Sequence, residues 1–501
     1  MLNDEQRRRS IPWRWMLASI VVLVLVTLFV RHDRVGTPGA GALAAALLVI
    51  SSSIFFRTAV KTGGLMNGYT LVLGTFLLVY PLSAFVHLTG SDYLSLGFYN
   101  LAALDPHTQA HHVYLSLVLV FLAQFALWWG LAPARPSPLK SRPQIIRVRS
   151  TLLVIAGVAF TLVGAASTYL LFSRSGEWLQ DLVTVNRTRE LEAGTARFVF
   201  MSEWLTWGVL FLLTAFLVSR ISKRHPKISL AVLIGGSACM LFNLFWTGGR
   251  AENLLAVLPL MFVVKKIRPR VFTPFASIIA AGLTGIVVFE TVARTTLLLD
   301  TGMDLIIRSG MSTSQFVANQ FSALFDWQMG RYATISLAID MVNRYGHAFG
   351  STLLQGLVMT INAPATLLHI SVKVPEPQAM TSLVGQYIYG DPTINSVVPG
   401  TLAELYYNFG ALGVAAGFFV IGWIARICIS VSRSSPDMGT RLFAFYVLTL
   451  LCVWTIPMTA TLGVYLLATR GLPILLFCTV EQTVSHAARP LPETAAHPAM
   501  S

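Results

Sequence analysis

The chain has 501 residues, of which 55% are hydrophobic and only 12% are charged, and its formal net charge is +14. Soluble proteins carry about 25% charged residues, so the composition excludes an ordinary soluble enzyme and indicates an integral membrane protein. The basic residues stand in short clusters between apolar runs, where they orient helices, and the positive charge therefore does not indicate a nucleic-acid partner.

Apolar runs of about 20 residues recur along the chain, and each is long enough to cross roughly 30 Å of hydrocarbon as a helix. No alternating ten-residue pattern of membrane strands competes with them. The sequence therefore predicts an all-α, polytopic membrane protein with about 12 transmembrane helices. The expected spans are residues 15–30, 38–56, 65–87, 113–133, 151–172, 198–219, 228–247, 251–264, 271–293, 412–431, 441–458 and 462–480.

Charge asymmetry between the connecting segments predicts the topology. Alternate segments hold most of the 36 Lys and Arg residues, and such segments stay in the cytoplasm. Both termini are then cytoplasmic. Four regions follow: an N-terminal bundle of about nine spans at 1–293, a long outer region at 294–411, C-terminal transmembrane helices at 412–480, and a tail at 481–501 whose Ala and Pro content predicts disorder.

The outer region at 294–411 is predicted to be partly helical. Phe316, Phe321 and Leu324 belong to an apolar series at helical spacing. Loop segments of this length with structure of their own are usually functional. We therefore expect the rest of the chain to hold this region.

Three arginines stand out because no carboxylate lies three or four positions away, where helical ion pairs form. They are Arg250, Arg331 and Arg470. Arg250 ends an apolar run and Arg470 lies within one, and a charge inside the hydrocarbon costs roughly 2.5 to 3.5 kcal/mol. We expect each to face a cavity and meet an anionic ligand or an acid partner. The alternative is a side chain that extends to the outer interface.

Other outer basic residues do have such a carboxylate, and surface ion pairs of this kind stabilise a protein weakly. A structural role is the first interpretation for them, and substrate binding is the second. The candidates retained for substrate binding are Arg187, Arg189, Arg294, Arg308 and Arg344.

Glu404 has two interpretations that are compatible. The stretch Thr401-Leu402-Ala403-Glu404 has the pattern of a capping box, in which Thr401 is the N-cap and Glu404 closes the box. A helix amino terminus at a membrane cavity would also point its partial positive charge at an anionic ligand, next to an acid that can take a proton.

Metal ligands are not specified by the sequence. His107 and His111 have a helical spacing that suits a metal, but a third and fourth ligand are lacking. Motifs of the Asp-x-Asp, His-Glu-x-x-His and phosphate-binding glycine-loop types are absent. We therefore expect no metal and no cofactor.

Three places in the chain resemble a known family, the bacterial oligosaccharide repeat-unit polymerases (Wzy-type O-antigen polymerases). They are Thr247-Gly248-Gly249-Arg250 at the start of a short span, the stretch from Gly400 to Gly410 that contains Glu404, Tyr407 and Asn408, and Arg470-Gly471 in the last span. With the span count and the long outer segment, the resemblance covers most of the chain.

The resemblance implies a glycosyltransferase-C-like enzyme of the bacterial inner membrane whose long loop is periplasmic. Such enzymes move a growing glycan from undecaprenyl pyrophosphate onto an incoming lipid-linked repeat unit, for O-antigen, capsule or exopolysaccharide. It implies catalytic roles for Glu404, Arg250 and Arg331, and substrate binding by Arg470, Tyr407 and Asn408. Lipid-linked oligosaccharides, membrane lipid and a chain-length regulator protein are the implied partners.

Two other functions remain open at this point. An O-antigen ligase uses the same donor but transfers the glycan to lipid A-core, and the acceptor is invisible in the sequence. A lipid-linked oligosaccharide flippase or another transporter would be expected to carry charged residues within several spans and paired bundle halves. Here the informative residues gather at the outer face, which favours an enzyme.

Overall fold

A computed structural model describes residues 38–62, 67–89, 106–132, 149–175, 201–247, 250–279, 281–282, 331–355, 357–358, 379–389 and 398–487. Within these ranges the chain is helical and contains no β-strand, so the predicted all-α class is confirmed there. The predicted span at 15–30 and the second half of the one at 271–293 lie outside them, as does the tail after residue 487.

The described elements are helices, and they occur along the chain in the following order. They are α3 (Pro38–Thr62), α4 (Gly68–Leu77), the π-helix η1 (Leu78–Leu82), α5 (Ser83–Thr89), α6 (Pro106–Leu131), α7 (Ser150–Ser175), α10 (Trp204–Val218), α11 (Arg220–Arg224), α12 (Pro226–Thr247), α13 (Arg250–Ile267), α16 (Tyr332–Tyr345), α18 (Met380–Tyr389), α19 (Gly400–Ser434), α20 (Met438–Leu450), the π-helix η4 (Leu451–Thr455), α21 (Ala460–Thr469) and α22 (Leu472–Ala487). Residues 269–279 are also helical.

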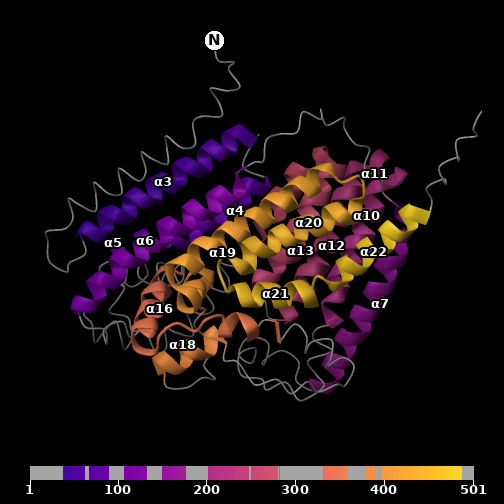
Figure 1. The fold of residues 1–501 in the computed structure, drawn as a ribbon. Helices are drawn as coiled ribbons and strands as arrows, with labels where there is room; N and C mark the ends of the chain where they lie inside the picture. The colour runs from indigo at the N-terminus through magenta and orange to yellow at the C-terminus, as the bar shows by residue number, and fades with distance from the viewer. Residues whose placement is uncertain are drawn as a thin grey trace, which may run out of the picture.

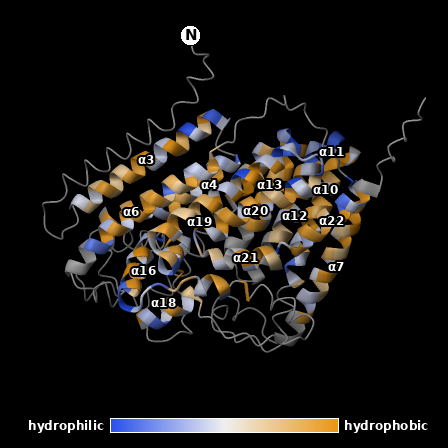
Figure 2. Cartoon of the chain, viewed as in Figure 1, coloured by the Kyte–Doolittle hydropathy of each residue, from blue (hydrophilic) through white to orange (hydrophobic). Residues whose placement is uncertain are grey.

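Six helical segments in the described part of the chain are long and apolar enough to cross a membrane. Apolar residues predominate along these helices, and hydrophilic residues gather near α11 on one side and around α16 and α18 on the other (Figure 2). These features support a membrane-embedded protein, and the number of about twelve spans stays a prediction. The six segments are Gly39–Thr62, Gly68–Leu88, His111–Leu131, Ser150–Leu170, Gly400–Ser434 and Met438–Thr455.

The helices pack as two bundles that share α20 (Figure 1). One hydrophobic core joins α3, α4, α6 and α19, and it receives Ala444 and Leu448 from α20. The other joins α7, α10, α12 and α13, and it receives Leu442 and Tyr446. Because residues two positions apart point to opposite sides of a helix, α20 serves the two cores with opposite faces.

Close contacts through glycine bring two pairs of helices together. A Cβ added at Gly130 of α6 would lie 2.2 Å from the carbonyl oxygen of Phe419 in α19, and one at Gly422 would lie 2.4 Å from that of Leu127. On the other side, a Cβ at Gly164 of α7 would lie 2.1 Å from a backbone nitrogen of α10. Small residues allow such close backbone contact between membrane helices.

Basic residues gather at one end of the molecule. Arg268 donates to Oγ of Ser222 in α11 (3.3 Å). Arg149 donates to the Val484 carbonyl (3.5 Å), and Arg426 donates to the Ala132 carbonyl (2.9 Å). At this end Glu481 of α22 accepts from the Gly439 amide (2.7 Å) in the first turn of α20. In Figure 1, α11 lies at the top, whereas α16 and α18 lie at the bottom.

The structure corrects the limits of two predicted spans. The span expected at 412–431 belongs to α19, which begins at Gly400 and contains a kink at Gly410; the polar stretch before 412 is helical because protein surrounds it. The span expected at 462–480 is interrupted at Arg470-Gly471 and continues as α22. Pro473 lies in the first turn of α22, the helical position that suits proline best.

The contact between α6 and α19 generates a test with one added carbon. We expect Gly130→Ala to lower the free energy of unfolding by about 1–3 kcal/mol, because its Cβ meets backbone that cannot move aside. The matched control is Gly235→Ala in α12, whose Cβ would have no neighbour within 4 Å. Thermal unfolding in detergent measures both, and equal melting temperatures for the two variants would contradict the proposed packing.

Candidate functional site

The helix formed by α20 and η4 breaks at residues 456–459 before α21 begins. Such a break frees backbone carbonyl and amide groups, which need partners inside a membrane protein because lipid offers none. In the described structure, side chains from η1, α19 and the start of α16 supply partners on both sides of the break.

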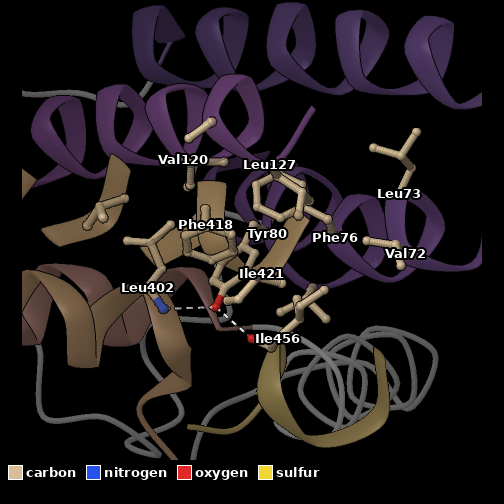
Figure 3. Packing of buried hydrophobic residues seen from close by; sticks show 14 of the residues in the cluster. Val72, Leu73, Phe76, Tyr80, Val120, Leu127, Leu402, Phe418, Ile421 and Ile456 are labelled. Carbon is tan, nitrogen blue, oxygen red and sulfur yellow. Dashed lines mark hydrogen bonds between the residues drawn. The ribbon is translucent and has the colours of Figure 1, made fainter. Parts of the chain in front are cut away.

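On the carbonyl side, three polar side chains donate to three successive residues. The Thr401 hydroxyl donates to the Thr455 carbonyl, the Tyr80 hydroxyl donates to the Ile456 carbonyl (2.8 Å), and Arg331 Nε donates to the Pro457 carbonyl (2.8 Å). Figure 3 shows the Tyr80 hydroxyl between the Ile456 oxygen and the Leu402 amide, which donates to it (3.2 Å).

On the amide side, the partner is Glu404. Its Oε2 accepts from the amides of Ala460 (2.7 Å) and Thr461 (3.4 Å), and its Oε1 accepts from the hydroxyls of Thr461 and Thr352. A carboxylate is stabilised at a helix amino terminus by the free N–H groups and the partial positive charge there. The fully buried Glu404 therefore caps α21 from α19.

The predicted capping box at Thr401 and Glu404 is wrong. Pro399 precedes α19 without a side-chain cap, and both box residues bond elsewhere, Thr401 to Thr455 and Glu404 to the start of α21. The break before α21 leaves several backbone groups without helical partners. The side chains of Thr401 and Glu404 bond to these groups instead of capping α19.

Asn408 joins Glu404 to the segment that follows α16. Its Nδ2 donates to the Glu404 carbonyl (2.7 Å) and to Thr352 Oγ1 (2.6 Å), and its Oδ1 accepts from the Gly350 amide (2.9 Å). The kink at Gly410, with φ of 65°, interrupts the helical bonding next to it. The carbonyls of Tyr407 and Asn408 accept instead from the amides of residues 348 and 349 (both 3.0 Å).

Gly400 places Arg331 at the start of α19. Its φ of +79° lies in the left-handed region that favours glycine. A Cβ there would lie 2.9 Å from Cβ of Arg331, and Thr334 donates to the Pro399 carbonyl next to it. Arg331 is almost completely buried, at 4% exposure. Burial also raises the pKa of the neighbouring Tyr332 phenol above its usual range, so Tyr332 stays neutral.

Arg470 lies at the other end of α21, about 15 Å along the helix from its amino terminus. Its Nε forms an ion pair with Glu203 (2.7 Å), and both side chains are largely buried. This agrees with the expectation of an acid partner, which sequence spacing could not identify because Glu203 lies next to the distant helix α10.

The structure thus brings Glu404, Arg331 and Asn408 together at one junction. Tyr407 lies beside them and packs its side chain in a small core with α16 and α18. Arg344 forms the expected pair with Asp340 (3.1 Å). Arg250 begins α13, and its side chain is not among those that the structure describes. Four other candidates lie wholly outside the described residues: Arg187, Arg189, Arg294 and Arg308.

Tyr80, Thr352 and Thr461 belong to the junction and were missed by the sequence analysis. Tyr80 lies in a predicted span, where a tyrosine is unremarkable. The sequence signal that could have found Thr461 is Pro457, because a proline inside an apolar run predicts an interrupted helix with unsatisfied backbone groups.

Comparison with known proteins returns no match to a family model, a curated protein or a solved structure.

The capping role of Glu404 predicts different effects of two substitutions on stability. Glu404→Gln keeps an oxygen for the two amides and an amino group for the rotatable threonine hydroxyls, so we expect nearly unchanged stability. Glu404→Ala leaves buried amides without an acceptor and should cost about 1–3 kcal/mol for each. Thermal unfolding in detergent compares them, and an alanine variant as stable as the glutamine variant would show that Glu404 does not hold α21.

Proposed function

We propose that the protein is a membrane glycosyltransferase that polymerises undecaprenyl-pyrophosphate-linked oligosaccharide repeat units at the periplasmic face of the bacterial inner membrane. The observation that supports this proposal is the junction of Glu404, Arg331 and Asn408 around a broken helix, on the α16 and α18 side of a bundle whose basic residues gather at the other end.

The residues at the junction suit the chemistry of this transfer. A hydroxyl of the acceptor sugar attacks the anomeric carbon of the donor and loses its proton, and undecaprenyl pyrophosphate leaves as an anion. Arginine stabilises a leaving phosphate by its permanent charge and two-pronged hydrogen bonding. Arg331 is the candidate for this role at the junction, and Glu404 is the candidate for orienting the hydroxyl and accepting its proton. The family resemblance adds Arg250 and Arg470, of which Arg470 lies at the far end of α21 and would have to exchange Glu203 for the phosphate.

The two oxygens of Glu404 are unequal in this respect. Oε2 is held by backbone amides, which are fixed donors. Oε1 is held by two threonine hydroxyls, which can rotate and become acceptors. We therefore assign proton acceptance to Oε1, with Thr352 and Thr461 as the groups that release it.

The transporter alternative gains support from the broken helix, because interrupted helices form substrate sites in many transporters. In those sites the free amino terminus of the half-helix points at an anionic substrate. Here the amino terminus of α21 is capped by Glu404 of the same chain, and we favour the enzyme for this reason. The ligase alternative differs only in its acceptor.

A deletion strain distinguishes the three functions. Lipid A-core that carries only a single repeat unit indicates a polymerase. Complete loss of lipid A-core that carries glycan indicates a ligase. Lipid-linked repeat units that accumulate at the cytoplasmic face indicate a transporter.

The proposed orientation predicts that a cysteine at the exposed Ser351, introduced into a variant without the four native cysteines, reacts with a membrane-impermeant maleimide added outside the inner membrane. A cysteine at the exposed Lys223 in α11 serves as the control and should react only after the membrane is permeabilised, because basic segments stay inside. The reverse pattern would overturn the topology.

Substitutions that preserve charge or hydrogen bonding should separate catalysis from folding. We expect Arg331→Lys and Arg470→Lys to shorten the glycan ladder, because lysine keeps the charge but loses the planar two-pronged contact. Glu404→Gln should lower the polymerisation rate by about 10²-fold or more, because an amide cannot take the proton. Arg224→Lys, exposed at the basic end, is the matched control. Normal ladders from all three site variants at normal protein levels would sink the proposed site.

A further inference from the structure

A second group of polar and aromatic side chains lies where α6, α16 and α18 meet, outside the junction described above. α16 is buried from Tyr332 to Met341 and becomes exposed at Asn343. Its last turn presents Arg344 and Tyr345 beside Tyr387 of α18, and Asn343 beside His112 of α6. We call these residues of α16 and α18, together with Asp340, the α16–α18 platform.

Every charged or planar group in the platform is fixed by a neighbour. Asp340, whose side chain is only 6% exposed, accepts from the Tyr387 hydroxyl and pairs with Arg344 Nε (3.1 Å). The Arg344 guanidinium lies over the Tyr387 ring, 5.3 Å from its centre. The rings of Tyr345 and Tyr387 meet edge to face at 6.2 Å. Ordered groups lose little entropy when a ligand binds.

Asn343 is fixed from below by a histidine. Its Nδ2 lies 3.2 Å from Nε2 of His112, a completely buried residue of α6. When Nε2 accepts this bond, the ring proton is on Nδ1, and that atom is buried with no hydrogen-bond partner among the residues that the structure describes. A buried donor without a partner costs free energy. The His112 tautomer that carries this donor on Nδ1 is also the tautomer that accepts from the Asn343 amide and so orients it.

The fixed groups still have unused hydrogen-bonding capacity at the surface. The Arg344 side chain is 55% exposed, and within the described residues its hydrogen-bonding partner is Asp340 through Nε, so its two terminal amino groups can donate to a ligand. Tyr345 is 69% exposed and presents an aromatic face. Docking of α18 explains the contact between Asp340 and Tyr387 and the edge contact between the Tyr345 and Tyr387 rings, but it does not use the Asn343 amide or the exposed face of the Tyr345 ring.

The charges indicate the class of ligand. Arg344 is already neutralised by Asp340 at 3.1 Å, so the platform has no excess charge to attract a pyrophosphate. Donors and acceptors of both kinds beside an aromatic face match a neutral sugar, whose hydroxyl groups form hydrogen bonds and whose C–H face packs on a ring. This narrows the substrate-binding role that the sequence predicts for Arg344 to the sugar part of the substrate.

We propose that the α16–α18 platform binds a neutral saccharide unit of the glycan through Arg344, Asn343 and the ring of Tyr345. The inference rests on the proposed function for the identity of the glycan. The platform lies beside α19, since Tyr407 packs against the same small core, so a sugar held there belongs to the chain that enters or leaves the Glu404 junction.

The test measures binding directly, without catalysis. The full-length protein is placed in nanodiscs, and saturation-transfer NMR is recorded with delipidated polysaccharide prepared from the strain's own cell surface. We expect wild-type binding, and a loss of affinity of about three- to tenfold in Tyr345→Ala, the range given by one aromatic contact. Arg344→Gln should weaken binding similarly. Tyr169→Ala, which removes an equally exposed tyrosine of α7, is the matched control.

Three outcomes would overturn the inference: no saccharide binding by the wild type, equal binding by Tyr345→Ala, or displacement of the saccharide by millimolar inorganic pyrophosphate that Arg344→Gln abolishes. The last outcome would assign the platform to the anion instead. Failure of the proposed function gives a different result, because saccharide binding would persist while the deletion strain kept a normal glycan ladder.

Discussion

The need to satisfy the backbone of a broken helix governs the arrangement of the functional region. The break at residues 456–459 leaves the carbonyls of residues 455–457 and the amides at the start of α21 without helical partners in a largely buried part of the protein. Their partners come from three distant parts of the chain: Tyr80, Arg331, and α19 with Thr401 and Glu404. Each of these side chains could be explained by the break alone, so its chemical role is additional to a structural one.

This double use explains why the junction contains such reactive residue types. A buried carboxylate is unfavourable unless hydrogen bonds compensate the loss of water, and the start of α21 supplies these bonds to Glu404. A buried guanidinium has the same requirement, and the Pro457 carbonyl supplies part of it to Arg331. The break therefore makes it possible to keep a carboxylate and a permanently charged guanidinium at one junction inside an apolar bundle.

The sequence was sufficient for the class of fold and for the general position of most described spans, because about 20 apolar residues in a row have few alternatives to a membrane helix. It also selected Arg331, through the lack of a carboxylate at helical spacing, and Glu404 and Asn408, through the motif at 400–410 and the family resemblance. It could not supply their partners. Arg470 meets Glu203 and Glu404 meets Ala460, and such contacts depend on packing, which local spacing does not encode. The capping box failed for the same reason, since its pattern describes one helix and ignores the competing end of another.

α20 is the element that the two bundles hold in common, and its opposite faces have separate neighbours. Tyr446 meets the ring of Trp207 at 4.9 Å in one bundle, whereas Ala444 and Leu448 belong to the core that contains α19. A substitution on one face can therefore be compensated only by partners in its own bundle. Over evolutionary time, residues on one face of α20 should co-vary with the core that contains α19, and residues on the opposite face should co-vary with the core that contains α10.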